Sequence, residues 1–233
     1  MRKLLLLVDS DAYIRENCYQ HQLYETLQKV FSVTSISIRQ MRWNPLINVD
    51  AFDIILSVLK QRTIYKYVDN IRCFLKDRPV FIYDQDPWQA LIDGSPTKGC
   101  YKQFQNKLNV KTLLLTSQWW TNFCTAQGFP SRFVRMGMLP KYCEVGPAWN
   151  ARPIHLGFQG TIHAHRKKFF DDLASMNLKV TVLPSAPYKV YLSALHTMQI
   201  YIHTENAPWM VEGALTPRNA LWIKDIEVTA RGC

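Results

Sequence analysis

The stretch His155–Leu183, HLGFQGTIHAHRKKFFDDLASMNLKVTVL, decides the fold. An apolar segment over 154–158 ends in a turn at Gly160, and a helical pattern follows over 166–176. A second apolar segment over 179–183 completes a strand–helix–strand unit. Because such a unit joins two parallel strands through a covering helix, it predicts the opening of a parallel α/β domain.

The residues before this stretch predict another domain of the same class. The continuous apolar run Leu4–Val8 is typical of a central parallel strand that is buried on both faces. Further strands and helices alternate after it. The predicted strands are 33–38, 52–59, 79–83, 112–115 and 133–136, and the predicted helices are 14–31, 65–75 and 118–127, the last closed by Gly128. The fold class is therefore α/β, with two Rossmann-like domains in tandem.

The segment Met138–Pro153 breaks the alternation and predicts a linker, because it is rich in proline and glycine and has little periodicity. It divides the chain into an N-terminal domain, 1–150, and a C-terminal domain, 151–233. The second domain continues with a helix over 188–195, a strand over 199–204, a polar loop over 205–217 and a last helix that begins near Arg218. It has fewer residues than the first, so we expect it to be incomplete or unusually small.

Composition limits the class of protein. The 233 residues are 48% hydrophobic and 20% charged, as in an ordinary soluble globular protein. The net charge of +10 permits polyanionic partners. Residues 1–150 carry 19 basic and 12 acidic side chains, and residues 151–233 carry 9 and 6. This even spread disfavours nucleic acid, which selects a concentrated patch, but it is compatible with peripheral contact to an anionic membrane.

The cysteines indicate a reducing compartment. The six residues are isolated and form no CxxC pair, which favours free thiols in the cytoplasm over a zinc or redox site. The apolar run after Met1 is too short for a signal peptide and is followed at once by Asp9 and Asp11. No apolar window is long enough to span a membrane.

Polar residues follow four of the predicted strands, where ligands of parallel sheets bind. These loops are Asp9–Asp11, Asp84–Asp86, Gly160–His163 and His203–Glu205. Their convergence predicts a binding cleft. For the second loop, an Asx-type turn before Pro87 is the alternative.

The turn at Gly160 leads into a basic helix start, Arg166-Lys167-Lys168. Free N–H groups at a helix start and nearby cations favour an anion such as a diphosphate. The alternative is a solvated basic first turn. His163 and His165 form an HxH pair, but no third ligand stands at a suitable spacing, so we expect no metal.

These motifs together resemble the donor-binding domain of retaining GT-B glycosyltransferases. The resemblance is carried by FQGTIHAHR (158–166), by YKVYLSALHTMQIYIHTE (188–205) and by PRNALWIKDIEVTARGC (217–233). In the family's acidic motif, one Glu contacts the donor sugar and a second, eight residues on, binds the ribose. Glu227 matches the second position, and Asn219 stands at the first, as in a branch of the family that uses Asn there.

The resemblance implies a metal-independent transferase that moves a sugar from a nucleotide-sugar donor to an acceptor, with no further cofactor. The donor-binding residues that it implies are Gly160, His163, Arg166, Lys167, Glu205, Asn219 and Glu227. In the first domain, LLLTSQWWTNFCTAQGF (113–129) is similar to the family's strand–Ser–helix–Gly signature. Asp84 and Asp86 then become candidate catalytic residues, and Asp9 and Asp11 candidate acceptor-binding residues.

Two other functions fit the same residues. The position of Asn219 and the small second domain also suit a degenerate, non-catalytic nucleotide-binding protein of the same fold. The net positive charge suits a protein that binds an anionic membrane or nucleic acid. The sequence does not identify the sugar, the base or the acceptor.

Overall fold

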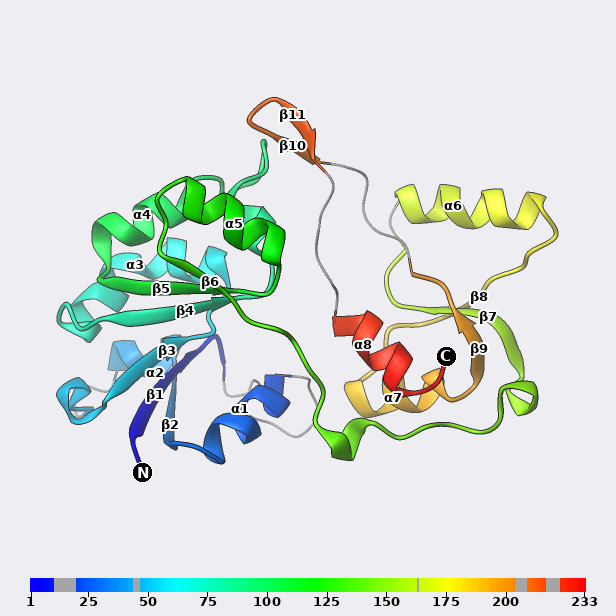
Figure 1. Ribbon diagram of the computed structural model, residues 1–233, viewed down its shortest axis with the longest axis horizontal. Coiled ribbons are helices and arrows are strands. Elements are labelled where there is room, and N and C mark those ends of the chain that lie inside the picture. The colour runs from blue at the N-terminus through cyan, green and yellow to red at the C-terminus, as the bar shows by residue number, and fades with distance from the viewer. Residues whose placement is uncertain (11–19, 44–46, 163, 204–208, 217–222) are drawn as a thin grey trace. The chain divides into compact units, whose positions relative to one another are not determined.

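The computed structural model describes residues 1–10, 20–43, 47–162, 164–203, 209–216 and 223–233 (Figure 1). The chain forms two compact units, and each is built from separate stretches of sequence. The described residues of the first unit come from 1–10, 23–135 and 209–216, and those of the second from 20–22, 136–203 and 223–233.

A parallel sheet of six strands, in the order β2-β1-β3-β4-β5-β6, is the centre of the first unit. The parallel α/β prediction is therefore confirmed for this unit. The strands are β1 (Lys3–Val8), β2 (Ser32–Ser37), β3 (Ile54–Ser57), β4 (Val80–Asp84), β5 (Val110–Leu115) and β6 (Ser131–Phe133). The strand order reverses between β1 and β3, which makes their carboxyl ends a topological switch point.

Five α-helices connect these strands, together with 3-10 turns at Val49–Ala51 and Pro87–Ala90. Ser117 caps the last helix by accepting a hydrogen bond from the backbone N–H of Trp120. The sequence patterns did not predict α2 or α4. The helices are α1 (Gln20–Gln28), α2 (Ile38–Trp43), α3 (Gln61–Leu75), α4 (Cys100–Lys107) and α5 (Gln118–Ala126).

The run of leucines in β1 is explained by burial on both faces of the sheet. Leu5 and Leu7 pack in the large core that includes α3 and α4. Leu4 and Leu6 point to the opposite face, where the cluster includes Tyr24 of α1. Alternate side chains of one strand therefore enter two different cores, as expected for a central parallel strand.

A hairpin of β10 (Trp209–Val211) and β11 (Ala214–Thr216) groups with the first unit, although 205–217 was predicted to be a loop in the second domain. Its turn, Glu212-Gly213, has φ values of +51° and +79°, as a type I′ turn requires. Val211 is only 4% exposed and packs with Trp88 and Trp120. Residues 209–216 therefore group with the first unit, where Val211 is buried.

The second unit has a three-stranded parallel sheet in the order β8-β7-β9. The predicted strands and helices of 154–203 are found here, with small shifts at their ends. The elements are β7 (Ile154–Gln159), α6 (Ala164–Ser175), β8 (Thr181–Leu183), α7 (Tyr188–Leu195), β9 (Met198–Tyr201) and α8 (Ile223–Ala230). The first compact unit gives way to the second between residues 135 and 136, whereas the sequence predicted the domain boundary at residue 150.

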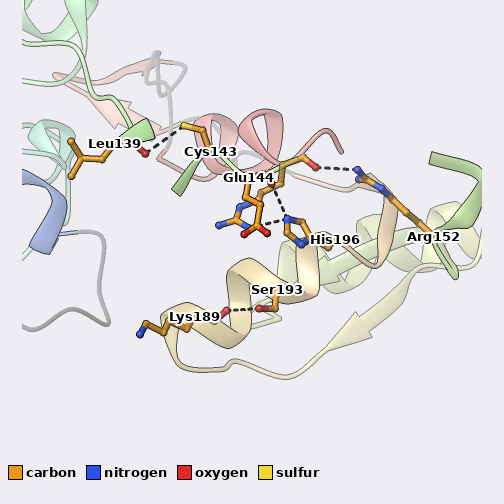
Figure 2. Close-up of polar contacts among 8 residues, drawn as sticks. Leu139, Cys143, Glu144, Arg152, Lys189, Ser193 and His196 are labelled. Carbon is orange, nitrogen blue, oxygen red and sulfur yellow. Dashed lines mark hydrogen bonds and ion pairs between the residues drawn. The ribbon is translucent and has the colours of Figure 1, made fainter. Parts of the chain in front are cut away.

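Arg152 links three segments of the second unit through hydrogen bonds. Its guanidinium donates to the carbonyl oxygens of Pro147, Met198 and Arg231, each at 3.0 Å. Arg152 is 3% exposed, and its bonds to Met198 and Arg231 are buried. Figure 2 shows the hydrogen bond of Arg152 to a backbone carbonyl oxygen, and His196 bonded to the carbonyl of Glu144 near the end of α7. The segment before β7, the strand β9 and the end of α8 are thus joined by one cation.

None of the described helices is long and apolar enough to cross a membrane.

Candidate functional site

Gly160 ends the central strand of the second unit in a conformation that favours glycine. Its φ is +140°, and a Cβ there would lie 3.2 Å from Nζ of Lys224 and 3.4 Å from the ring of Phe158. Both the backbone and the crowding therefore require a residue without a side chain. The close approach of a phosphate to the Gly160 backbone stays a prediction.

Arg166 comes from the first turn of α6 and folds back toward the same end of β7. Its Cζ lies 4.7 Å from the ring centroid of Phe158, and Nη1 donates to the carbonyl of Thr161 at 2.5 Å. Partial burial lowers the pKa of the guanidinium. Lys167 is exposed on the same helical turn. Arg166 therefore lies near the turn at Gly160, and the diphosphate-binding role of Lys167 stays a prediction.

A second cation, Lys224, reaches this position from α8. Its Nζ donates to the carbonyl of Gln159 at 3.2 Å and lies 5.8 Å from the Phe158 centroid and 5.7 Å from that of Tyr191. Burial, and then the charge of Arg166, lower the pKa of the ammonium. The sequence analysis missed this residue, because its contact with Gln159 spans 65 positions and belongs to no local motif.

Glu227 lies one turn after Lys224 on α8, but its carboxylate is held inside the unit. The residue is 2% exposed, and Oε1 accepts a hydrogen bond from the hydroxyl of Tyr188 at 2.7 Å. Burial raises the pKa of this carboxyl. The structure thus shows a carboxylate engaged with the protein, and the ribose-binding role stays a prediction.

The ends of β7 and β9 are bonded to each other and to α8. The hydroxyl of Tyr201 donates to the carbonyl of Gln159 at 3.1 Å. Nδ1 of His203 lies 2.7 Å from Oδ1 of Asp225. These contacts fix α8, and therefore Lys224, against the carboxyl edge of the sheet.

In the first unit, Asp84 is buried at the carboxyl end of β4. It is 8% exposed, and its Oδ2 accepts hydrogen bonds from Nε2 of Gln61 at 2.5 Å and from the hydroxyl of Tyr101 at 2.7 Å. Its Oδ1 accepts from the backbone N–H of Asp86 at 2.9 Å, the turn that the sequence allowed as an alternative. Burial raises the pKa of Asp84. Asp86 itself is exposed.

Asp9 lies at the switch point after β1. Its Oδ2 accepts a hydrogen bond from the backbone N–H of Lys60 at 3.0 Å. Lys60 and Gln61 are consecutive residues at the start of α3, so Asp9 and Asp84 meet the same helix start. The binding cleft predicted from four such loops stays a prediction.

Four predicted site residues, Asp11, His163, Glu205 and Asn219, lie outside the residues that the structure describes. Among the described residues, no group of three or more histidine, cysteine or acidic side chains is placed to hold a metal ion. Comparisons with protein-family models, curated proteins and solved structures gave no match. Function must therefore be inferred from the residues themselves.

Proposed function

We propose that this protein is a glycosyltransferase of the GT-B type that moves a sugar from a nucleotide-sugar donor to an acceptor without a bound metal. The observation that carries the proposal is the pair of cations, Arg166 and Lys224, that converges on Phe158 beside Gly160 at the end of a central parallel strand. Ligands of such sheets bind at this edge.

The chemistry of sugar transfer from a nucleotide donor suits such a place. The departing nucleoside diphosphate gains negative charge as its bond to the sugar breaks, and fixed cations lower the energy of that charge. In this proposal Arg166 and Lys167 bind the diphosphate, and Gly160 lets a phosphate oxygen approach the backbone. Glu227 keeps its proposed place near the ribose.

On the acceptor side, the two aspartates at the end of β4 have different proposed roles. Asp84 is buried and accepts three hydrogen bonds, which suits a residue that shapes the loop. Asp86 is exposed at the same strand end, so it is the better candidate to orient the acceptor or assist proton transfer. Asp9, half-buried at the switch point, stays a candidate for acceptor binding.

Donor binding and turnover test the proposal separately. Isothermal titration of the full chain with UDP, GDP, TDP, ADP and their sugar conjugates should identify one base. Arg166→Ala should then weaken binding about 10- to 100-fold, since a hydrogen bond to a charged group contributes about 1.5–3 kcal/mol. Lys179→Gln, which removes an exposed charge of the same unit, is the matched control and should bind as the unchanged chain does. Unaltered affinity in Arg166→Ala would refute the phosphate assignment.

One observation favours a second candidate, a nucleotide-binding protein without turnover. The carboxylate of Glu227 is bonded to Tyr188, and Asn219 occupies the position of the family's sugar-contacting Glu. The binding-only candidate predicts nucleotide affinity without release of nucleoside diphosphate from any nucleotide sugar. Chromatographic detection of released diphosphate, with and without a mixture of sugar and lipid acceptors, decides between the two.

A further inference from the structure

Lys224 has an unusual environment for a lysine. Its ammonium carries three N–H donors, and among the described residues one of them has a protein acceptor, the carbonyl of Gln159. No carboxylate of the described chain forms an ion pair with it. Lysine side chains that are partly buried are normally paired, because burial of an isolated charge is costly.

The neighbouring charges make this placement less favourable still. Arg166 lies on the same Phe158 ring, and its positive charge lowers the pKa of Lys224. The compensating charge is Glu227, one turn along α8, whose Oε1 already accepts from Tyr188. The ammonium of Lys224 is thus held near a second cation on the same ring.

Gln159, whose backbone carbonyl accepts the hydrogen bond from Lys224, is held by its own side chain. Its side chain is 96% buried, since the residue is 4% exposed, and Nε2 donates to the carbonyl of Pro184 at 3.0 Å. Its Oε1 is buried without a hydrogen-bond partner among the described residues. An unpaired buried acceptor costs about 1–3 kcal/mol. The backbone carbonyl of this same residue is the one that binds Lys224.

We propose that Lys224 is the second cation of this site and that it contacts the same diphosphate as Arg166, an inference that rests on the proposed function. A diphosphate carries enough negative charge to neutralise both cations, and it offers acceptors for the unused donors of the ammonium. A single phosphate has fewer oxygens to share between them. The site therefore selects a diphosphate over a monophosphate.

Titration of the full chain with inorganic pyrophosphate and inorganic phosphate, at fixed ionic strength, tests this role. We expect Lys224→Gln to weaken pyrophosphate binding at least tenfold and to reduce the preference for pyrophosphate over phosphate. Lys224→Met, which keeps the apolar contacts with Phe158 and Tyr191, should behave in the same way. Lys179→Gln should bind pyrophosphate normally, and melting temperatures report whether each variant is folded.

A double-mutant cycle shows whether the two cations share one ligand. If they do, Arg166→Gln and Lys224→Gln will be non-additive, because removal of either already weakens the hold on the same diphosphate. Wild-type affinity in both Lys224 variants overturns the inference, and so does an unchanged chain that does not bind pyrophosphate.

Turnover separates this inference from the proposed function. Sugar transfer that continues unchanged in Lys224→Gln would refute the inference alone. Pyrophosphate binding that depends on Lys224, without turnover of any nucleotide sugar, would support the inference and refute the transferase.

Discussion

Replacement of Asp84 tests whether the polar end of β4 is structural. Asp84→Ala removes the acceptor of three hydrogen bonds. Gln61 keeps a bond from Nε2 to the carbonyl of Asp86 at 3.0 Å, and water can replace the acceptor at the exposed Asp86 N–H. The hydroxyl of Tyr101, a residue that is 1% exposed, is left buried without its carboxylate. An unsatisfied buried donor costs about 1–3 kcal/mol and each of the two replaced bonds about 0.5–1.5 kcal/mol, so we expect a loss of about 2–6 kcal/mol.

Urea unfolding, followed by tryptophan fluorescence and circular dichroism, measures this loss. Asp69→Ala is the matched control, because it also removes a carboxylate, but one in an exposed ion pair with Lys107 that contributes about 1 kcal/mol or less. The reasoning fails if Asp84→Ala unfolds within about 0.5 kcal/mol of the unchanged chain.

The pH dependence of the stability provides a second test of the Asp84 carboxyl. Burial raises the pKa of Asp84 above the ordinary value of 3.8, so the folded state retains the proton at a pH where the unfolded state has lost it. The contribution of Asp84 to stability is therefore largest below pH 3.8 and decreases as the pH rises through the folded-state pKa. Asp84→Asn, which cannot ionise, should show a flatter stability profile over this window. A profile identical to that of the unchanged chain would contradict the assignment.

Three further changes probe other contacts by urea unfolding. Arg152→Met should destabilise the second unit by about 2–4 kcal/mol, because two buried carbonyl oxygens and one part-buried carbonyl oxygen lose their donor, and a neutral result would refute the linking role of Arg152. Gly157→Ala should cost about 1–3 kcal/mol, since its Cβ would lie 2.5 Å from the buried side chain of Met198, unless that side chain can move aside at no cost. Val211→Ala should cost about 1–2 kcal/mol by removing methyl groups from the cluster with Trp88 and Trp120, and unchanged stability would show that the hairpin is not packed there.

Most strands and helices could be predicted because burial leaves a periodic pattern. The run Leu4–Val8 predicted β1, and the helix predicted over 188–195 matches α7. The hairpin was missed because each of its strands has three residues and its turn has Glu212, not Asn or Asp, before Gly213. A Gly in the second turn position between alternating residues was the signal that could have found it.

The site was predicted in part, and for a physical reason. Gly160 and Arg166 lie within one strand–turn–helix unit, so local sequence was enough to bring them together. Lys224 joins them from a helix that is distant along the chain, and only the folded second unit shows its approach to Gln159. Asp84 looked like Asp86 in the sequence, yet the structure buries Asp84 and exposes Asp86, and Gln61 and Tyr101 donate to the carboxylate of Asp84.

The return of residues 209–216 to the first unit affects how the protein can be made. Gly213 donates to Asp93 across 120 positions of sequence, so this contact cannot form until most of the polypeptide has left the ribosome. Until then the nascent first unit shows Trp88 and Trp120 without the valine that covers them. Because residues 209–216 pack onto the first unit late and over a long sequence distance, folding is slow. The aggregation-prone aromatic surface therefore stays exposed for longer. A fragment that stops at residue 135 would retain that surface permanently, so we expect it to aggregate or to require a chaperone.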